Sequence, residues 1–309
     1  MQGGSTFKAF GLLAALQKDI STKTTFNGFS PQYFKQFIGP GDPRGRVPNF
    51  GPGSGEQFGR IDLRKATAHS VNTVFAQLNI MLADGGTSAT ALRDAAILAG
   101  LPKGCTGPTP ALPCTPGLGT SMNNILGTAS PHVIDMANAY ATIAAQGTRA
   151  TPYVISKVTS ADGSIDYKVN KKLTRVFDKK VTADVTEAMT HVVTEGTGSG
   201  AQALGRPAAG KTGTTDKNLA VWFDGFTPQL SAAVGPYLSP ATTRQDKGTA
   251  PTPGKLGRQH PRGRAPVEVW AAVRTGGTKG QKVIDFPPRA GLGDSTLPPP
   301  PTTTAPPTT

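Results

Sequence analysis

The feature that most constrains the fold is a run of apolar residues near the start of the chain, FKAFGLLAALQK at residues 7–18. Its pattern predicts a helix that carries apolar side chains on nearly every side. Such a helix is not stable on a surface, so we expect it in the middle of a domain with other elements around it. The chain has 309 residues, of which 37% are apolar, and can supply that core.

A serine and a lysine stand at the start of this helix, Ser5 and Lys8. A spacing of three places Lys8 one turn after Ser5, where its amine can reach the hydroxyl. Apolar neighbours favour the neutral amine, which can accept a proton, and the helix N-terminus favours negative charge at Ser5. About one such match is expected by chance in a chain of this size. The alternative is that Ser5 caps the helix and Lys8 points into solvent.

A second serine, Ser70, interrupts a helical pattern that runs from Asp62 to Leu82. In Ser70-Val71-Asn72 the hydroxyl and the amide can point into one cavity. There Ser70 could shuttle a proton and Asn72 could hydrogen-bond a substrate amide. The alternative is a pair of capping residues that open the following helix.

The most specific motif is Lys211-Thr212-Gly213, which is followed by Thr214 and by strand-like sequence. Only about 0.1 chance matches are expected in a chain this long. On an edge strand, Lys211 and Gly213 point to one side, and the two threonines to the other. Lys211 would supply positive charge, the threonine hydroxyls would bind a carboxylate, and Gly213 would let a substrate backbone approach closely. The alternative is a hairpin turn; a phosphate-binding loop is excluded because the motif leads into a strand.

Other elements follow from the same patterns. Further helices are predicted at 89–99, 131–145 and 182–193. Asp162-Gly163 lies between two strand-like runs and predicts a hairpin, and residues 219–234 alternate as two strands joined at Thr227-Pro228.

Two cysteines, Cys105 and Cys114, lie nine positions apart in CTGPTPALPC. We expect a disulfide that pins this proline-containing loop, with two free thiols as the alternative. A zinc site would need four ligands. A disulfide indicates an oxidising location outside the cytoplasm. No run approaches the roughly 20 apolar residues of a membrane-spanning helix.

The formal net charge of +13 first suggests a nucleic-acid partner. The basic residues form no single long run and no nucleic-acid-binding signature is present, so we expect no nucleic acid. An anionic polymer such as a cell wall fits the charge equally well.

The order Ser-x-x-Lys, Ser-x-Asn, Lys-Thr-Gly is the triple of penicillin-binding proteins and related serine β-lactamases. GSTFKAF resembles the nucleophile helix of class A penicillin-binding proteins, and HSVNTVFAQL resembles their second motif. GRPAAGKTGTTDKNLAVWFDGFTPQLSAAV is similar to their third-motif region. The resemblance covers about residues 2–234 and, weakly, 265–288, and the Pro/Thr-rich tail resembles those of actinobacterial members.

The resemblance implies an α/β fold, with a central antiparallel sheet flanked by helices and an all-helical subdomain beside it. Residues 1–234 would be a transpeptidase domain that lacks its N-terminal elements, and 265–288 its C-terminal element. The segment 235–264 is irregular and basic, which suggests a reading-frame disturbance, and 289–309 reads as a disordered tail. The full-length parent would carry a membrane anchor and a glycosyltransferase domain, and would work in the cell envelope.

The activity implied is that of a D,D-transpeptidase. Ser5 would attack the D-Ala–D-Ala carbonyl of a peptidoglycan stem peptide and release D-alanine, and an amine of a neighbouring peptide would then take the acyl group. Lys8 would be the base and Ser70 the proton shuttle. β-Lactams would acylate Ser5, and no metal or cofactor would be needed.

The same resemblance assigns the binding groups. Asn72 would hold the substrate amide, and Thr212 and Thr214 would bind the terminal carboxylate beside Gly213. Lys211 would lie near Ser70. The backbone N–H groups of Ser5 and Thr214 would form the oxyanion hole.

Two other functions remain open at this stage. A D,D-carboxypeptidase or β-lactamase would share the motifs, but a β-lactamase typically uses a deacylating glutamate between the second and third motifs. Only Glu187 and Glu195 lie there, on or after the helix before Lys-Thr-Gly, which disfavours it. The other function is an inactive fragment that binds β-lactams or peptidoglycan, because a missing first strand exposes a sheet edge.

Overall fold

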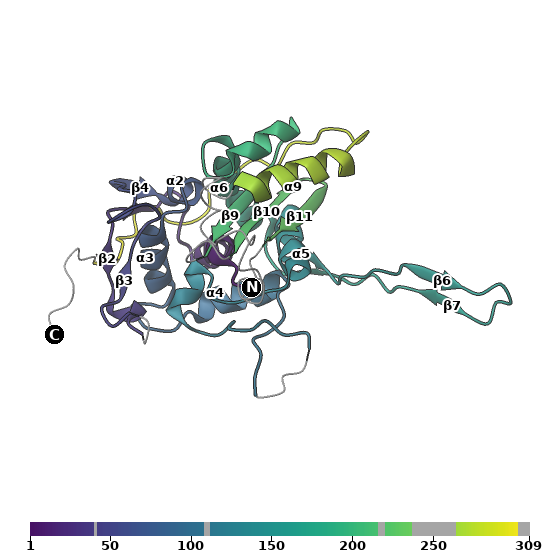
Figure 1. Cartoon of the computed structure of the whole chain (residues 1–309), viewed down its shortest axis with the longest axis horizontal. Helices are drawn as coiled ribbons and strands as arrows, with labels where there is room; N and C mark the ends of the chain where they lie inside the picture. The colour runs from purple at the N-terminus through teal and green to yellow at the C-terminus, as the bar shows by residue number, and fades with distance from the viewer. Residues whose placement is uncertain (40–41, 108–111, 216–219, 237–263, 302–309) are drawn as a thin grey trace, which may run out of the picture.

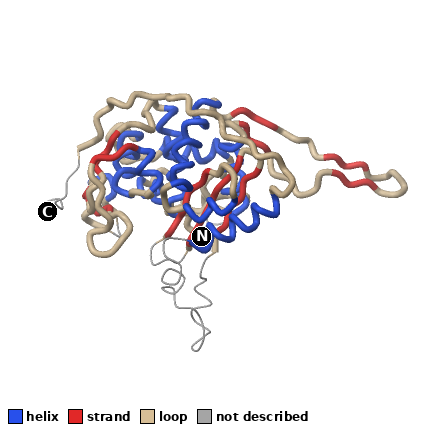
Figure 2. Tube along the Cα trace, turned by 90° about the horizontal axis from the view of Figure 1, so that it is seen from above, coloured by secondary structure: helices blue, strands red, loops and turns tan. Residues whose placement is uncertain are grey.

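The computed structural model describes residues 1–39, 42–107, 112–215, 220–236 and 264–301. In these ranges a three-stranded antiparallel sheet lies beside a larger group of helices, and a narrow two-stranded ribbon projects away from both (Figures 1 and 2). This is the mixed α/β arrangement that the resemblance implied.

The apolar run near the N-terminus forms the central helix. A short 3-10 turn, η1 (Gly4–Phe7), leads directly into α1 (Lys8–Gln17), and every residue from Lys8 to Leu16 is buried. The helices α3 (Asn72–Leu82), α4 (Thr90–Ala99) and α6 (Lys179–Thr194) pack around it. The prediction of a helix surrounded by other elements is therefore confirmed.

The sheet contains β9 (Ala209–Thr214), β10 (Val221–Thr227) and β11 (Leu230–Val234) in the order β11-β10-β9. Helices cover both faces (Figure 1). On one face the ring of Phe226 contacts Tyr140 of α5 (Val133–Ala144), and on the other the ring of Phe223 contacts Trp270 of α9 (Arg264–Gly277). The predicted pair of strands at 219–234 is confirmed.

The helical part of the molecule also contains small sheets. The helical pattern at 62–82 breaks where the sequence predicts it, between α2 (Leu63–Ala68) and α3. The structure adds to the expected helical subdomain two antiparallel pairs and two 3-10 turns: β1 (Thr25–Asn27) with β4 (Arg60–Asp62), β2 (Gln32–Tyr33) with β3 (Arg46–Val47), η2 (Lys35–Phe37) and η3 (Met122–Leu126).

The projecting ribbon begins with β5 (Thr148–Ala150), which pairs with β8 (Leu173–Arg175). Beyond this pair, β6 (Lys157–Thr159) and β7 (Asp166–Lys168) form the far hairpin. Its turn contains Gly163 with φ +74°, so the hairpin that the sequence predicts around Asp162-Gly163 is confirmed.

Helix α6 is longer than the sequence predicts. It starts at Lys179 because the Asp178 carboxylate accepts a hydrogen bond from Lys180 N at 2.7 Å and so caps the helix. The 3-10 turn η4 (Ser199–Leu204) follows it and packs against α9.

The residues after α9 run back along the body. The buried carboxylate of Asp184 accepts hydrogen bonds from the backbone N–H groups of Ala290, Gly291 and Leu292 at 2.5, 3.1 and 2.6 Å. Composition places 289–309 in a disordered tail, but this first part of it is held by an acidic side chain far away in sequence. The irregular segment predicted at 235–264 lies, except for its ends, outside the described residues, as does 302–309.

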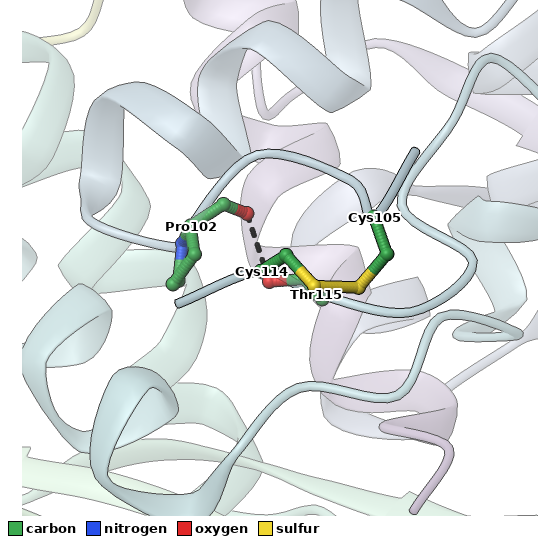
Figure 3. The surroundings of a disulfide bond; sticks show 4 residues. All are labelled: Pro102, Cys105, Cys114 and Thr115. Atoms are coloured by element: carbon green, nitrogen blue, oxygen red, sulfur yellow. Dashed lines mark hydrogen bonds between the residues drawn. A yellow bond between two sulfur atoms is a disulfide. The ribbon is translucent and has the colours of Figure 1, made fainter. Parts of the chain in front are cut away.

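Cys105 and Cys114 are joined by a disulfide with a Cα–Cα distance of 5.0 Å (Figure 3). Next to it, the Thr115 hydroxyl donates a hydrogen bond to Pro102 O at 2.8 Å. Among the described helices, none combines the length and apolar character needed to cross a bilayer.

Candidate active site

The amine of Lys8 connects the first two motifs. Its Nζ lies 3.0 Å from Ser5 Oγ, 2.8 Å from Ser70 O, 3.2 Å from Ser70 Oγ and 2.6 Å from Asn72 Oδ1. The Lys8 side chain is completely buried. Lys8 therefore does not point into solvent, and its amine contacts the hydroxyls of both serines.

Close backbone packing fixes the position of Ser5. Gly3 N and Gly4 N donate to Ala129 O and Gly127 O at 2.9 and 3.0 Å. Gly4 has φ +56°, and a Cβ at this position would lie 3.0 Å from Thr214 N. The residue that precedes α1 is Phe7, and no side chain caps either η1 or α1. The capping alternative for Ser5 is therefore wrong.

Ser70 sits at a tight turn between two helices. It has φ +59°, a conformation that is uncommon for a residue with a side chain. The turn is closed by Val71 N, which donates to Ala66 O at 2.9 Å. No side chain caps α3. Asn72 Nδ2 donates to Pro48 O at 2.9 Å, which turns Asn72 Oδ1 toward Lys8. Asn72 thus positions the lysine, a contact that the sequence did not indicate.

The third motif lies on β9, one of the two outer strands of the described sheet. The hairpin-turn alternative is therefore wrong for Lys211–Thr214, while residues 216–218, on which it also rested, lie outside the described residues. Lys211 is fully buried, and its Nζ donates to Thr212 O at 3.2 Å. The hydroxyl of Thr212 lies 2.6 Å from that of Thr197. A Cβ on Gly213 would lie 2.6 Å from Gly3 O. Glycine is therefore needed at this position so that the N-terminal segment of the chain can pack against the strand.

Both lysines are in conditions that favour the neutral amine. Burial, and next to it the positive charge of Lys211, lowers the pKa of Lys8 well below its ordinary value. Burial lowers the pKa of Lys211 to about 7. A neutral Lys8 that contacts Ser5 Oγ can accept the proton of the hydroxyl, which is the requirement for a nucleophilic serine.

Two cavities meet at Ser5. One, of about 140 Å³, is lined by Ser5, Ser70, Asn72, Thr212 and Thr214 together with Phe50, Glu56, His69, Glu195, Gly196 and Thr197. The other, of about 430 Å³, reaches Ser5 from the side of Arg46 and Thr128. Each of the three motifs thus contributes residues to the lining of one hollow, whereas Lys8, Lys211 and Gly213 are not part of that lining. The sequence carried no signal for Glu56, which belongs to no motif and reaches the cavity only through folding. His69 stands directly before Ser70 in the second-motif stretch. Glu195, which its place after the helix disfavoured as a deacylating residue, also lines the cavity.

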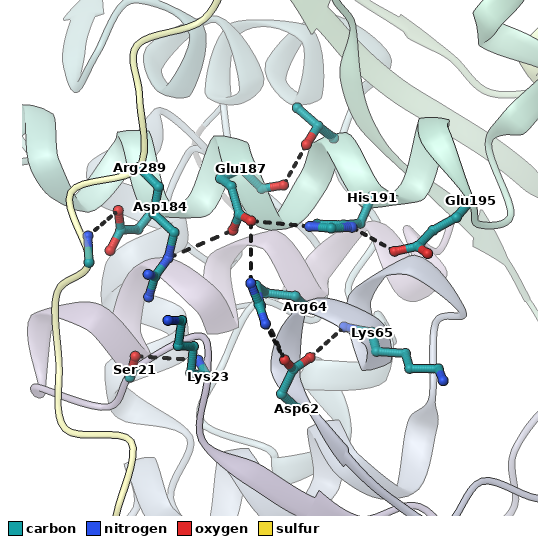
Figure 4. A network of polar contacts seen from close by, with 12 residues as sticks. Ser21, Lys23, Asp62, Arg64, Lys65, Asp184, Glu187, His191, Glu195 and Arg289 are labelled. Atoms are coloured by element: carbon teal, nitrogen blue, oxygen red, sulfur yellow. Dashed lines mark hydrogen bonds and ion pairs between the residues drawn. The ribbon is translucent and has the colours of Figure 1, made fainter.

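A polar network holds α2, which precedes Ser70, against α6 (Figure 4). Arg64 Nη2 lies 2.6 Å from Asp62 Oδ2, and Arg64 Nη1 lies 3.7 Å from Glu187 Oε1. His191 bridges two carboxylates, at 3.1 Å to Glu187 and 2.6 Å to Glu195. The chain of contacts ends at Glu195, which lines the smaller cavity.

Comparisons with known proteins show the family of the chain. Residues 1–234 match the family model described as penicillin binding protein transpeptidase domain. Penicillin-binding protein 1A of Mycolicibacterium smegmatis is 32% identical over 300 residues, which cover 94% of this chain and 35% of the relative. The Mycobacterium tuberculosis protein of the same name is 32% identical over 304 residues, covering 93% of this chain and 33% of the relative.

Solved structures show the same fold. The structure of PonA1 from Mycobacterium tuberculosis in complex with penicillin V has a TM-score of 0.71 and 29% identity, and covers 97% of this chain and 76% of that one. Another PonA1 structure has a TM-score of 0.73 and covers all of this chain and 76% of that one, also at 29% identity.

The fold and the clustered motifs define a protein of the penicillin-binding class. The chain belongs to the family of penicillin-binding protein transpeptidase domains and is similar to the mycobacterial 1A proteins. It spans about a third of the length of these curated relatives.

Proposed function

We propose that the chain carries the chemistry of a serine D,D-transpeptidase, which cross-links peptidoglycan stem peptides through an acyl-enzyme. The observation that carries the proposal is the contact of a fully buried lysine amine, Lys8 Nζ, with Ser5 Oγ at 3.0 Å. Family membership supports a transpeptidase reaction of this kind.

In the acylation step, Lys8 takes the proton of Ser5 as Oγ attacks the carbonyl of a D-Ala–D-Ala terminus. Ser70 Oγ, 3.2 Å from Lys8 Nζ, passes the proton to the leaving D-alanine amine. The oxyanion would be bound by the N–H groups of Ser5 and Thr214, which the close packing of Gly4 brings together. One such donor is worth about 3 kcal/mol of barrier.

Substrate binding involves the rest of the cavity. Thr212 and Thr214 offer hydroxyls to the terminal carboxylate, beside Gly213, and Lys211 adds positive charge when protonated. Asn72 would have two roles: it would hold the substrate amide, and it holds Lys8 through Oδ1. β-Lactams would be bound in the same way and would acylate Ser5.

The experiment has two readouts. Incubation with a fluorescent penicillin, followed by a denaturing gel, should label the wild type and Ser88→Ala, which changes an exposed serine, but not Ser5→Ala. Incubation with a pentapeptide ending in D-Ala–D-Ala and an amine acceptor should release D-alanine and form a peptide–amine product, both dependent on Ser5. Absence of labelling in folded wild-type protein would refute the proposal of an acyl-enzyme and would indicate an inactive fragment.

One observation favours hydrolysis as a second candidate reaction. Glu195 lines the cavity that contains Ser5 and could activate a water molecule on the acyl-enzyme. Loss of label from wild-type protein over hours, slowed in Glu195→Gln, would indicate a carboxypeptidase or β-lactamase. A stable label in both proteins would exclude this candidate.

The location follows from the same proposal. A peptidoglycan substrate and the Cys105–Cys114 disulfide both fit a cell envelope outside the cytoplasm. We propose that the parent protein is longer, with a membrane anchor and a glycosyltransferase domain, because the curated relatives are about three times as long as the matched part.

A further inference from the structure

A third threonine lies beside the two threonines of the third motif. Thr197 belongs to the turn between α6 and η4, and its hydroxyl lies 2.6 Å from that of Thr212 on β9. Both residues line the smaller cavity, of about 140 Å³, which also contains Ser5. Thr197 belongs to none of the three sequence motifs, so only folding brings its hydroxyl to this cavity.

The main chain fixes Thr197 at this place. Thr197 N donates a hydrogen bond to Ala68 O at 3.0 Å, at the end of α2 and two residues before Ser70. Gly196 packs against the same carbonyl, because a Cβ at Gly196 would collide with Ala68 O. The position of Thr197 therefore depends on main-chain contacts, which a change of its side chain leaves in place.

The cavity is lined by hydroxyl groups and carboxylates rather than by basic side chains. Among the described residues of the lining, none is a lysine or an arginine, and the ionisable ones are Glu56, His69 and Glu195. Lys8 and Lys211 are fully buried and do not belong to the lining. An anionic group in this cavity therefore depends on hydroxyl and amide donors for its direct contacts.

The two paired hydroxyls can be arranged in only a few ways. A hydroxyl group donates one hydrogen bond and can accept others, and either member of the pair of Thr197 and Thr212 could be the donor. A carboxylate only accepts, so when it contacts Thr212 the hydrogen of that hydroxyl points to the anion. Thr212 Oγ1 then accepts from Thr197. Two O–H groups in such a chain strengthen each other, most of all toward a charged acceptor.

We propose that Thr197 is a positioning residue of the carboxylate-binding site, which donates its hydroxyl hydrogen to Thr212 and so directs the O–H of Thr212 at the substrate. The inference rests on the proposed function, because the anion is the terminal carboxylate of a stem peptide or of a β-lactam. Thr214 lies on the same side of β9 as Thr212 and offers another donor. The site then contains three threonine hydroxyls, one of them outside the strand.

The test removes the hydroxyl of Thr197 and keeps the shape of the side chain. Thr197→Val does this because both residues are branched at Cβ, whereas Thr197→Ser keeps the hydroxyl. The first readout compares a fluorescent penicillin with its carboxylate methyl ester as acylating agents of Ser5. The acid-to-ester ratio of labelling rates should fall about tenfold in Thr197→Val, as expected when a hydrogen bond to a charged group is weakened. The ratio should stay near the wild-type value in Thr197→Ser.

The second readout is turnover of a pentapeptide that ends in D-Ala–D-Ala. The contact to the terminal carboxylate is made in the bound substrate and in the transition state alike. Its weakening in Thr197→Val should therefore raise KM about tenfold and leave kcat nearly unchanged. A bond that only joins the turn to the strand would instead slow labelling by acid and ester equally when it is lost.

The control removes a hydroxyl of the same kind from the same helix. Thr194 donates from an exposed hydroxyl to Thr190 O at 3.2 Å and does not line the cavity, so Thr194→Val should change neither readout. Thr197→Ala, which also lacks the hydroxyl, gives the same comparison if the valine variant does not fold. An unchanged acid-to-ester ratio, or an equal loss for acid and ester, would overturn the inference alone. A wild type that neither compound labels would overturn the proposed function and the inference together.

Discussion

Replacement of Lys8 by methionine tests the centre of the proposed mechanism. Methionine has a similar length and is apolar, so it can occupy the buried channel without the amine. The base that lies 3.0 Å from Ser5 Oγ is then lost. A general base contributes about 10²- to 10⁴-fold, so labelling by a fluorescent penicillin should slow about 10³-fold, or about 4 kcal/mol of barrier.

The same change should affect folding much less. It leaves Ser70 O and Asn72 Oδ1 without the donor that reaches them at 2.8 and 2.6 Å, which costs about 1–3 kcal/mol each. It also removes the cost of burying an amine, which acts in the opposite direction. Urea unfolding should therefore show a net change of about 3 kcal/mol or less.

The assay is a time course of labelling for folded protein, with Lys18→Met as the control. Lys18 pairs with Asp84 at 2.9 Å near the surface, where such a pair is worth about 0–1 kcal/mol, so both stability and labelling should be nearly unchanged. Wild-type labelling rates in folded Lys8→Met would refute the assignment of Lys8 as the base.

Three further predictions follow from burial and close packing. Lys211 has a pKa of about 7 in the folded state, against 10.5 ordinarily, so the unfolded chain binds more protons between these two pH values. The free energy of unfolding should therefore rise with pH in that window, and it should rise less in Lys211→Met. Urea unfolding at pH 7 and pH 9 measures both changes. Gly127→Ala would place a Cβ against Gly4 O, so it should displace the segment that carries Ser5 and abolish penicillin labelling. The control is Gly163→Ala, at a residue that also has a positive φ but has open space around it; this variant should label normally. Asp184→Asn removes a carboxylate that accepts three backbone hydrogen bonds, so hydrogen exchange at 290–292 should increase while exchange in α1 stays slow; unchanged exchange at 290–292 would show that the segment is held by other contacts.

The sequence was sufficient for the local elements. The break at Ser70, the strands at 219–234 and the hairpin at Gly163 depend on short-range patterns, which a sequence displays directly. The start of α6 was missed because Asp178 caps it from outside the apolar pattern. The attachment of 290–292 was missed because its partner, Asp184, lies more than 100 residues away in the sequence.

The features of the candidate site can likewise be separated into those that the sequence predicted and those that only folding produced. The three motifs and their order come from the sequence, and their spacing predicted that Lys8 reaches Ser5. Only the tertiary structure decided that Asn72 holds Lys8 through Oδ1 and that Glu195 lines the cavity. Only the folded turn after α6 placed Thr197 against Thr212. The physical reason is that residue type and spacing determine which groups can react, whereas burial and the pairing of distant segments determine which of them meet and in what state of protonation.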